Sequence, residues 1–199
     1  FERVPRWGVL CQVSSALAHV HALGILHRDL KSDNVMLLEP VPQGVTPVAK
    51  VADFGLGKRL VEQNLANTPL MPKGYKPGLW YAPEVATNSE HGRPADVYAF
   101  GVLVAEAVLA SNSGNIIANW PPSAIVAFLR RRKRSSRVEV ERLVEACLSA
   151  AAGHRPQMLA VFHSLSTRVL PQQLEALAVT FANASAVQAG SPVSTDVNR

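Results

Sequence analysis

The sequence predicts a mainly helical α+β fold, and three observations support this fold class. Apolar residues recur at helical spacing in several separate stretches of the chain. Two short apolar runs, at residues 35–38 and 48–52, flank a segment with proline and glycine and predict a small β-hairpin. Residues 95–110 are apolar on nearly all sides, which is typical of a helix inside a core. With 199 residues, 48% of them hydrophobic and 18% charged, the chain can bury one core, and fibrous or wholly disordered proteins are excluded.

The first predicted helix begins near Pro5 and ends before Gly24. Proline is tolerated in the first turn of a helix, and glycine commonly follows the last turn. One face of this segment carries apolar residues at helical spacing, which are Val9, Val13, Leu17 and Val20.

A long irregular segment is predicted after the hairpin. Residues 54–83 show no periodicity and are interrupted by Pro69, Pro72, Gly74, Pro77 and Gly78. Irregular segments of this length inside a compact domain are usually functional or disordered.

The second half of the chain is predicted to be helical. Shorter amphipathic stretches follow the apolar helix at about residues 123–132, 138–148 and 157–165. Pro171 opens one more stretch with apolar residues at Leu174, Leu177 and Phe181. We therefore expect a domain over residues 1–168, an extra helix over residues 169–188 and a disordered tail over residues 189–199.

Charge and cysteine content narrow the setting in which the protein works. The formal net charge of +5 comes largely from the run at residues 130–137 and does not require a nucleic-acid partner. No stretch is long and apolar enough to predict a membrane span. Cys11 and Cys147 lack metal-binding spacing, so we expect reduced thiols and an intracellular, cytoplasmic protein. Because Phe1 is not an initiator methionine, we also expect missing upstream sequence, which could anchor the full-length protein to a membrane.

Three short motifs carry the chemical information in the sequence. His27-Arg28-Asp29-Leu30-Lys31-Ser32-Asp33-Asn34 lies between the first helix and the hairpin, and Asp53-Phe54-Gly55 follows the second strand. Ala82-Pro83-Glu84 ends the long irregular segment. Each motif alone is weak, but their order and the elements between them make a chance match a poor explanation.

With these motifs, the chain resembles the eukaryotic protein kinase family from about residue 7 to residue 165. Asp96 and the Cys147-Leu148 and Arg155-Pro156 pairs are similar to further family positions. The resemblance implies a protein-kinase-like fold, of which the chain holds the C-terminal, substrate-side helical lobe with a small β-hairpin, the N-terminal lobe being absent. It also implies that Asp96 anchors the backbone of the first motif and that Arg155 pairs with Glu84.

The resemblance assigns a chemical role to five residues. Phosphoryl transfer relies mainly on positioning and on neutralising the charge of phosphate oxygens. Asp29 matches the base that accepts the proton of the incoming hydroxyl, and Lys31 is placed to steady the γ-phosphoryl group. Asn34 and Asp53 supply the oxygen ligands that Mg²⁺ prefers. Met36 would form the floor under the adenine ring of ATP.

The resemblance also implies regulatory and structural roles. Arg28, beside the base, marks kinases in which this arginine grips a phosphate on the long irregular segment. Thr68 and Tyr75 are the candidates for that phosphorylation, and neither ranks above the other. Structural roles within the motifs fall to His27 and Phe54, which are expected to stack, and to Gly55.

Lys31 in the first motif and two residues near the end of the long segment indicate the type of kinase. Lys31 is similar to serine/threonine kinases, whereas Trp80 is placed as in tyrosine kinases and the tyrosine-kinase-like group. Pro77 stands where serine/threonine enzymes carry a hydroxyl residue, and proline has neither a hydroxyl nor an N–H group. This pattern favours a tyrosine-kinase-like serine/threonine kinase. It leaves open whether the accepted hydroxyl belongs to serine or threonine, or to tyrosine.

Three hypotheses for function follow. The favoured one is the C-terminal lobe of an active kinase that uses ATP, Mg²⁺ and a protein substrate. Residues 1–26 hold no Gly-rich loop, strand lysine or helix glutamate, so we expect the fragment alone to be inactive. A pseudokinase or protein-interaction module is the alternative, which the intact Asp29, Asn34 and Asp53 disfavour. Nucleic-acid binding by residues 130–134 ranks far lower, because a solvated helix end explains that run and no aromatic residue interleaves with it.

Overall fold

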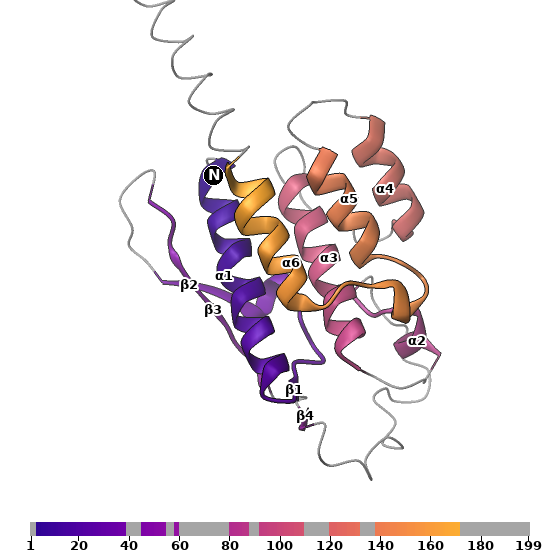
Figure 1. Ribbon diagram of the computed structural model, residues 1–199, viewed down its shortest axis with the longest axis horizontal. Coiled ribbons are helices and arrows are strands. Elements are labelled where there is room, and N and C mark those ends of the chain that lie inside the picture. Colours follow the sequence, from indigo (N-terminus) through magenta and orange to yellow (C-terminus); the bar gives the residue numbers. More distant parts are fainter. Residues whose placement is uncertain are drawn as a thin grey trace, which may run out of the picture.

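The structure of the protein is a computed structural model (Figure 1). It describes residues 3–38, 45–54, 58–59, 80–87, 92–109, 120–131 and 138–171. Within these residues, helices form most of the molecule, and two small antiparallel sheets lie beside them. The predicted mainly helical α+β class is confirmed for this part of the chain. Gly55, Thr68, Tyr75 and the tail at residues 189–199 lie outside the described residues.

Helix α1 (Arg3–Ala22) confirms the first predicted helix. Its apolar face, which includes Val13 and Leu17, is buried against the rest of the molecule. Gly24 follows the helix with a φ of 72°, a left-handed conformation that glycine adopts without steric cost. The chain reverses there and enters strand β1 (Ile25–Leu26).

Helix α3 (Arg93–Leu109) is the centre of the core, as the apolar pattern predicted. Thirteen of its 17 residues are buried. Gly101 lets helix α5 (Val138–Cys147) come close, because a Cβ atom at this position would lie 2.6 Å from the Cβ of Cys147. Burial raises the pKa of the Cys147 thiol to about 12, so this cysteine acts as a small core residue.

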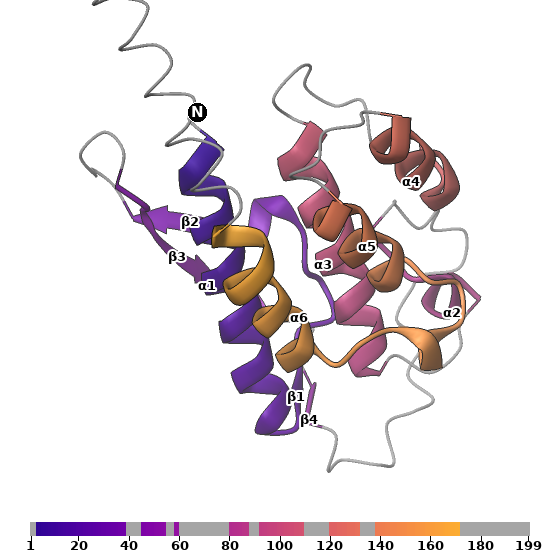
Figure 2. The same cartoon turned by 45° about the horizontal axis from the view of Figure 1, so that its top comes forward.

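The remaining helices surround α1 and α3. Helix α6 (Met158–Ser164) packs along α1, and both views show the two helices side by side (Figure 2). A π-helical segment, η7 (Leu165–Val169), continues α6, and helical backbone extends through residue 171. The other helical elements are α2 (Pro83–Ala86), α4 (Pro122–Arg131), and the 3₁₀ turns η1 (Ser32–Asn34) and η6 (Ala152–His154). The helix predicted beyond Pro171 lies outside the described residues, so the boundary at residues 168 and 169 stays a prediction.

The predicted hairpin is present as β2 (Val35–Leu38) and β3 (Val48–Val51). Its register pairs Val35 with Val51 and Leu38 with Val48. Residues of β2 alternate between partly buried and exposed, as in a half-buried strand. Gln12 of α1 fastens the hairpin, because its amide nitrogen donates to the Pro47 carbonyl at 2.9 Å and its amide oxygen accepts the Ala49 N–H at 2.9 Å.

A second sheet was not predicted. Strand β4 (Lys58–Arg59) pairs antiparallel with β1, so that Lys58 lies opposite Leu26. Two-residue strands have no measurable sequence periodicity, and this pairing depends on tertiary contact alone. It holds the beginning of the long segment beside the residues that precede the first motif.

The basic run begins at an exposed helix end. Helix α4 ends at Arg131, and Arg130 forms an exposed ion pair with Glu145 of α5. The prediction of a solvated helix end is confirmed for these two arginines, and residues 132–137 lie outside the described part. Among the helices that the structure describes, none has the length and apolar character needed to cross a membrane.

Candidate functional site

The first motif is held by a buried carboxylate at the beginning of α3. Asp96 is 1% exposed, and its two oxygens accept the backbone N–H groups of His27 and Arg28, each at 2.9 Å. His21 of α1 contacts the same carboxylate at 2.8 Å. These contacts fix the backbone immediately before Asp29, and the predicted anchoring by Asp96 is therefore present.

His27 joins the first motif to the second. Its side chain is fully buried, and Nε2 lies 3.0 Å from the carbonyl oxygen of Ala52. The rings of His27 and Phe54 lie 4.5 Å apart between centroids, at an angle of 46°. The predicted stacking of these two residues is present, and it places the end of β3 against the loop that carries Asp29.

Asp29, Lys31 and Asn34 form one polar cluster. The Lys31 Nζ donates to Asp29 Oδ2 at 2.7 Å. Asn34 Nδ2 donates to the Asp29 carbonyl oxygen at 2.6 Å and to Oδ2 at 3.2 Å. The hydrogen bond to Asp29 raises the pKa of Lys31, so this side chain carries a positive charge beside the carboxylate.

Asn34 and Asp53 are neighbours because the hairpin joins them. Asn34 immediately precedes β2, and its carbonyl oxygen accepts the Ala52 N–H at 2.8 Å. Among the described residues, no hydrogen bond reaches the amide oxygen of Asn34, and Asp53 carries an exposed carboxylate. An amide oxygen and a carboxylate from residues at one end of a hairpin are a donor set that suits Mg²⁺. Met36 lies two residues beyond Asn34 and is 58% exposed on the solvent-facing side of β2.

Two residues of the site have left-handed backbone conformations. Arg28 has a φ of 71° and Asp53 a φ of 60°. Such conformations cost roughly 1–3 kcal/mol in non-glycine residues and persist where surrounding contacts enforce them. The Arg28 side chain is buried, which lowers its pKa against the opposing effect of the Asp96 charge. Arg28 immediately precedes Asp29, and Asp53 is itself a candidate ligand, so strain is concentrated at the site.

A residue that the sequence did not single out also reaches Asp29. The Tyr81 hydroxyl donates to Asp29 Oδ1 at 3.4 Å, whereas Lys31 donates to Oδ2. Tyr81 lies 52 positions from Asp29 in the sequence, immediately before Ala82-Pro83-Glu84. No local pattern marks such a contact, because it depends on how the third motif packs against the first.

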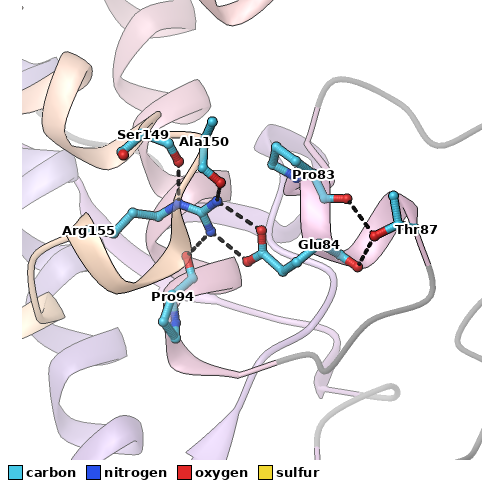
Figure 3. Close-up of polar contacts among 7 residues, drawn as sticks. All are labelled: Pro83, Glu84, Thr87, Pro94, Ser149, Ala150 and Arg155. Atoms are coloured by element: carbon cyan, nitrogen blue, oxygen red, sulfur yellow. Dashed lines mark hydrogen bonds and ion pairs between the residues drawn. The ribbon is translucent and has the colours of Figure 1, made fainter.

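The third motif is fixed by a buried ion pair (Figure 3). Arg155 Nη1 and Nη2 donate to the two carboxylate oxygens of Glu84 at 2.6 and 2.9 Å. The Arg155 side chain is 0% exposed and that of Glu84 is 18% exposed. Arg155 also donates to three carbonyl oxygens, those of Ser149 at 2.8 Å, Pro94 at 3.0 Å and Ala150 at 3.4 Å. The predicted pairing of Arg155 with Glu84 is therefore present.

Glu106 lies in the apolar helix α3 and contacts the first motif through Ser32. Burial raises its pKa to about 7, the Ser32 hydroxyl lowers it by hydrogen bonding, and the nearby charge of Asp33 raises it. Glu106 is a carboxylate within the apolar part of α3, ten residues after Asp96, and this sequence signal could have drawn attention to the position. We therefore expect Glu106 to make the stability of the chain depend on pH.

Replacing Glu106 by glutamine is expected to remove this sensitivity. As the pH rises from about 4.5 to 7, the unfolded chain loses the Glu106 proton first, so ionisation favours unfolding and stability falls. We compare the free energy of unfolding of Glu106→Gln with that of the parent chain. Because the carboxyl is only half-buried, we expect this difference to move in favour of the variant by about 1 kcal/mol between pH 5 and pH 8. Urea denaturation at both values measures the difference. Glu145→Gln on an exposed surface is the control, and a pH-independent effect of Glu106→Gln would contradict the assignment.

A comparison with known families covers most of the chain. The sequence model described as protein tyrosine and serine/threonine kinase matches residues 5–165. The matched region contains all three motifs, the hairpin, helices α2 to α6 and all but the first two residues of α1.

Similar individual proteins are much longer than this chain. The kinase STE20 of Saccharomyces cerevisiae is 33% identical over 102 residues, or 51% of this chain and 10% of that protein. The STE20 kinase of Yarrowia lipolytica is also 33% identical over 102 residues, or 51% of this chain and 8% of that protein. A Dictyostelium discoideum protein, named as a probable LIM domain-containing serine/threonine-protein kinase, is 27% identical over 159 residues, 79% of this chain and 23% of that protein. The matched region is thus less than a quarter of each of these relatives.

Proposed function

Because the chain belongs to the protein tyrosine and serine/threonine kinase family, we propose that it forms the catalytic-loop part of a kinase that phosphorylates a protein. The reaction moves the γ-phosphoryl group of ATP to a protein hydroxyl. One observation carries the proposal: Asp29, Lys31 and Asn34 form a single hydrogen-bonded cluster, which the buried Asp96 holds in place.

Asp29 acts as the base in this proposal. Its carboxylate accepts the proton of the incoming hydroxyl as the oxygen–phosphorus bond forms and the bond to ADP breaks. Lys31 and Asn34 both donate to Oδ2, so these two side chains orient the carboxylate from one side. In this proposal the positive charge of Lys31 would offset the negative charge that develops on the transferred phosphoryl group.

Asn34 and Asp53 would hold Mg²⁺ through an amide and a carboxylate oxygen. The bound ion would neutralise part of the triphosphate charge, as phosphoryl transfer requires. Met36, on the exposed face of β2, would lie under the adenine ring. Arg28 would hold a phosphate added to the long segment at Thr68 or Tyr75.

The nature of the acceptor and the extent of the active unit complete the proposal. The named relatives described above are serine/threonine kinases, which favours serine or threonine as the acceptor. We propose that a Gly-rich loop, a strand lysine and a helix glutamate from outside residues 1–199 cover the nucleotide. On this basis, residues 1–199 alone are expected to have no useful activity.

Removal of Mg²⁺ tests the proposed chemistry in the whole protein that contains residues 1–199. Transfer from radiolabelled ATP to a generic protein substrate is expected to stop in excess EDTA and to return with added Mg²⁺. Phosphoamino-acid analysis of the product identifies the accepted hydroxyl. Activity that continues undiminished in the chelator would contradict the proposal.

A Mg²⁺ titration assigns the ligand. Asp53→Asn replaces a charged oxygen by a neutral one, so it is expected to raise the Mg²⁺ concentration for half-maximal activity at least about tenfold. Asp33→Asn removes an exposed carboxylate from the same region and is the matched control. Equal Mg²⁺ requirements in both variants would remove Asp53 from the metal site.

A further inference from the structure

The Asp29 carboxylate is contacted from two directions by parts of the chain that are distant in sequence. Lys31 and Asn34, from its own loop, reach Oδ2. Tyr81, from the segment before α2, reaches Oδ1 at 3.4 Å. We propose that Tyr81 is a positioning residue, whose phenolic hydroxyl holds Oδ1 so that the remaining lone pair of that oxygen faces the acceptor hydroxyl. This inference rests on the proposed role of Asp29 as the base.

The hydrogen bonds of the carboxylate leave one position for a substrate. An ionised carboxylate offers about four lone-pair positions, two on each oxygen. Among the described residues, Lys31 and Asn34 fill both positions on Oδ2, and Tyr81 fills one on Oδ1. The position that is left lies on Oδ1, next to the Tyr81 hydroxyl. Tyr81 therefore determines in which direction the base can accept a proton.

The contact joins two separately anchored parts of the molecule. Tyr81 is followed by Ala82, which is 1% exposed, and by Glu84, whose carboxylate is held by Arg155. Asp29 follows the backbone that Asp96 holds. Because both sides are fixed by buried contacts, the distance between Tyr81 and Asp29 does not depend on an exposed, freely rotating side chain.

The space between the two sides is small. A cavity of about 10 Å³ is lined by ten residues that include Asp29, Trp80 and Tyr81. This volume is about that of one water-sized probe, so the third motif packs closely against the first. Trp80 and Tyr81 are half-buried and pack against the core, which limits the rotation of the phenol ring.

The inference is tested by measuring the kinetics of the whole protein with and without the substitution Tyr81→Phe. The variant removes one oxygen atom and keeps the ring. Loss of one hydrogen bond to the carboxylate is expected to lower kcat about 5- to 10-fold, with the KM for ATP unchanged. The acidic limb of the pH–rate profile is expected to move to higher pH, because a hydrogen bond that stabilises the ionised form is lost. Tyr98→Phe, which removes a hydroxyl from a buried ring beside Arg155, is the matched control and should change neither quantity.

The outcomes separate this inference from the proposed function. If Asp29→Asn abolishes transfer while Tyr81→Phe keeps the parent kcat and pH profile, Tyr81 has no positioning role and the proposed function stands. A lower kcat with an unchanged pH profile and a lower Tm in Tyr81→Phe shows a merely structural role and also overturns the inference. If the parent protein transfers no more phosphate than Asp29→Asn, the proposed function and the role of Tyr81 both fail.

Discussion

Asp29→Asn is expected to lower kcat by a factor of about 10² to 10⁴ in the whole protein, which is the range that a positioned general base supplies. Asparagine keeps the size of the side chain and can still accept a hydrogen bond through its amide oxygen. It cannot take up the proton of the acceptor hydroxyl. Because Lys31 and Asn34 would still surround the side chain, binding of ATP should change little. Steady-state kinetics with ATP and a protein substrate separate the two effects as kcat and KM.

Asp33→Asn is the control for this result. It removes a carboxylate from the same motif, four positions further on, where the side chain is exposed in η1. We expect its kcat to stay within about threefold of the parent value, because an exposed charge contributes little to a neighbouring site. Equal kcat values for Asp29→Asn and the parent protein would remove Asp29 from the role of base.

Arg155→Met is expected to lower the free energy of unfolding by about 3–5 kcal/mol, because removing one partner of a buried ion pair leaves the other charge uncompensated. Glu84 loses two short hydrogen bonds, and the carbonyl oxygens of Ser149 and Pro94 lose a donor. Methionine preserves most of the side-chain length, so little of the loss comes from an empty space. Urea denaturation of the 199-residue chain, followed by circular dichroism, measures the change.

The exposed pair of Arg130 and Glu145 provides the matched control. Its side chains are 60% and 50% exposed, and exposed ion pairs contribute at most about 1 kcal/mol. Arg130→Met should therefore lower the free energy of unfolding by no more than that. If Arg155→Met is as mild as Arg130→Met, the Glu84 pair does not hold the third motif in place. A double substitution with Glu84→Gln then measures how much of the loss belongs to the pair itself.

Much of the fold could be predicted from local patterns. The apolar residues of α1 and α3 recur at helical spacing, and the two runs that became β2 and β3 were separated by proline and glycine. The pairing of β1 with β4 could not be predicted, because two residues carry no period and their partner lies across the molecule. The π-helical segment η7 was missed for a similar reason, since one wide turn leaves the apolar spacing almost unchanged.

Some contacts of the candidate site could likewise be predicted from the sequence, and others could not. Asp29, Lys31 and Asn34 lie within six residues of one motif, so the sequence alone brings them together. The ion pair of Arg155 with Glu84 spans 71 positions and was predicted only through the family resemblance. The contact of Tyr81 could be predicted neither from one motif nor from the resemblance, because its hydroxyl reaches Asp29 through the packing of two separately anchored segments.

The Gln12 contacts with the hairpin have a consequence for how this protein can diverge. Gln12 binds the backbone at Pro47 and Ala49. Along the chain, these two residues lie between the connection at residues 39–44 and Val51, which pairs with Val35 next to Asn34. Because the entropy cost of closing a loop grows only slowly with its length, we expect a change in the length of this connection to leave the register beyond the Gln12 contacts unchanged. Insertions can therefore accumulate there over evolution, while the ends of the strands that carry Asn34 and Asp53 keep their geometry.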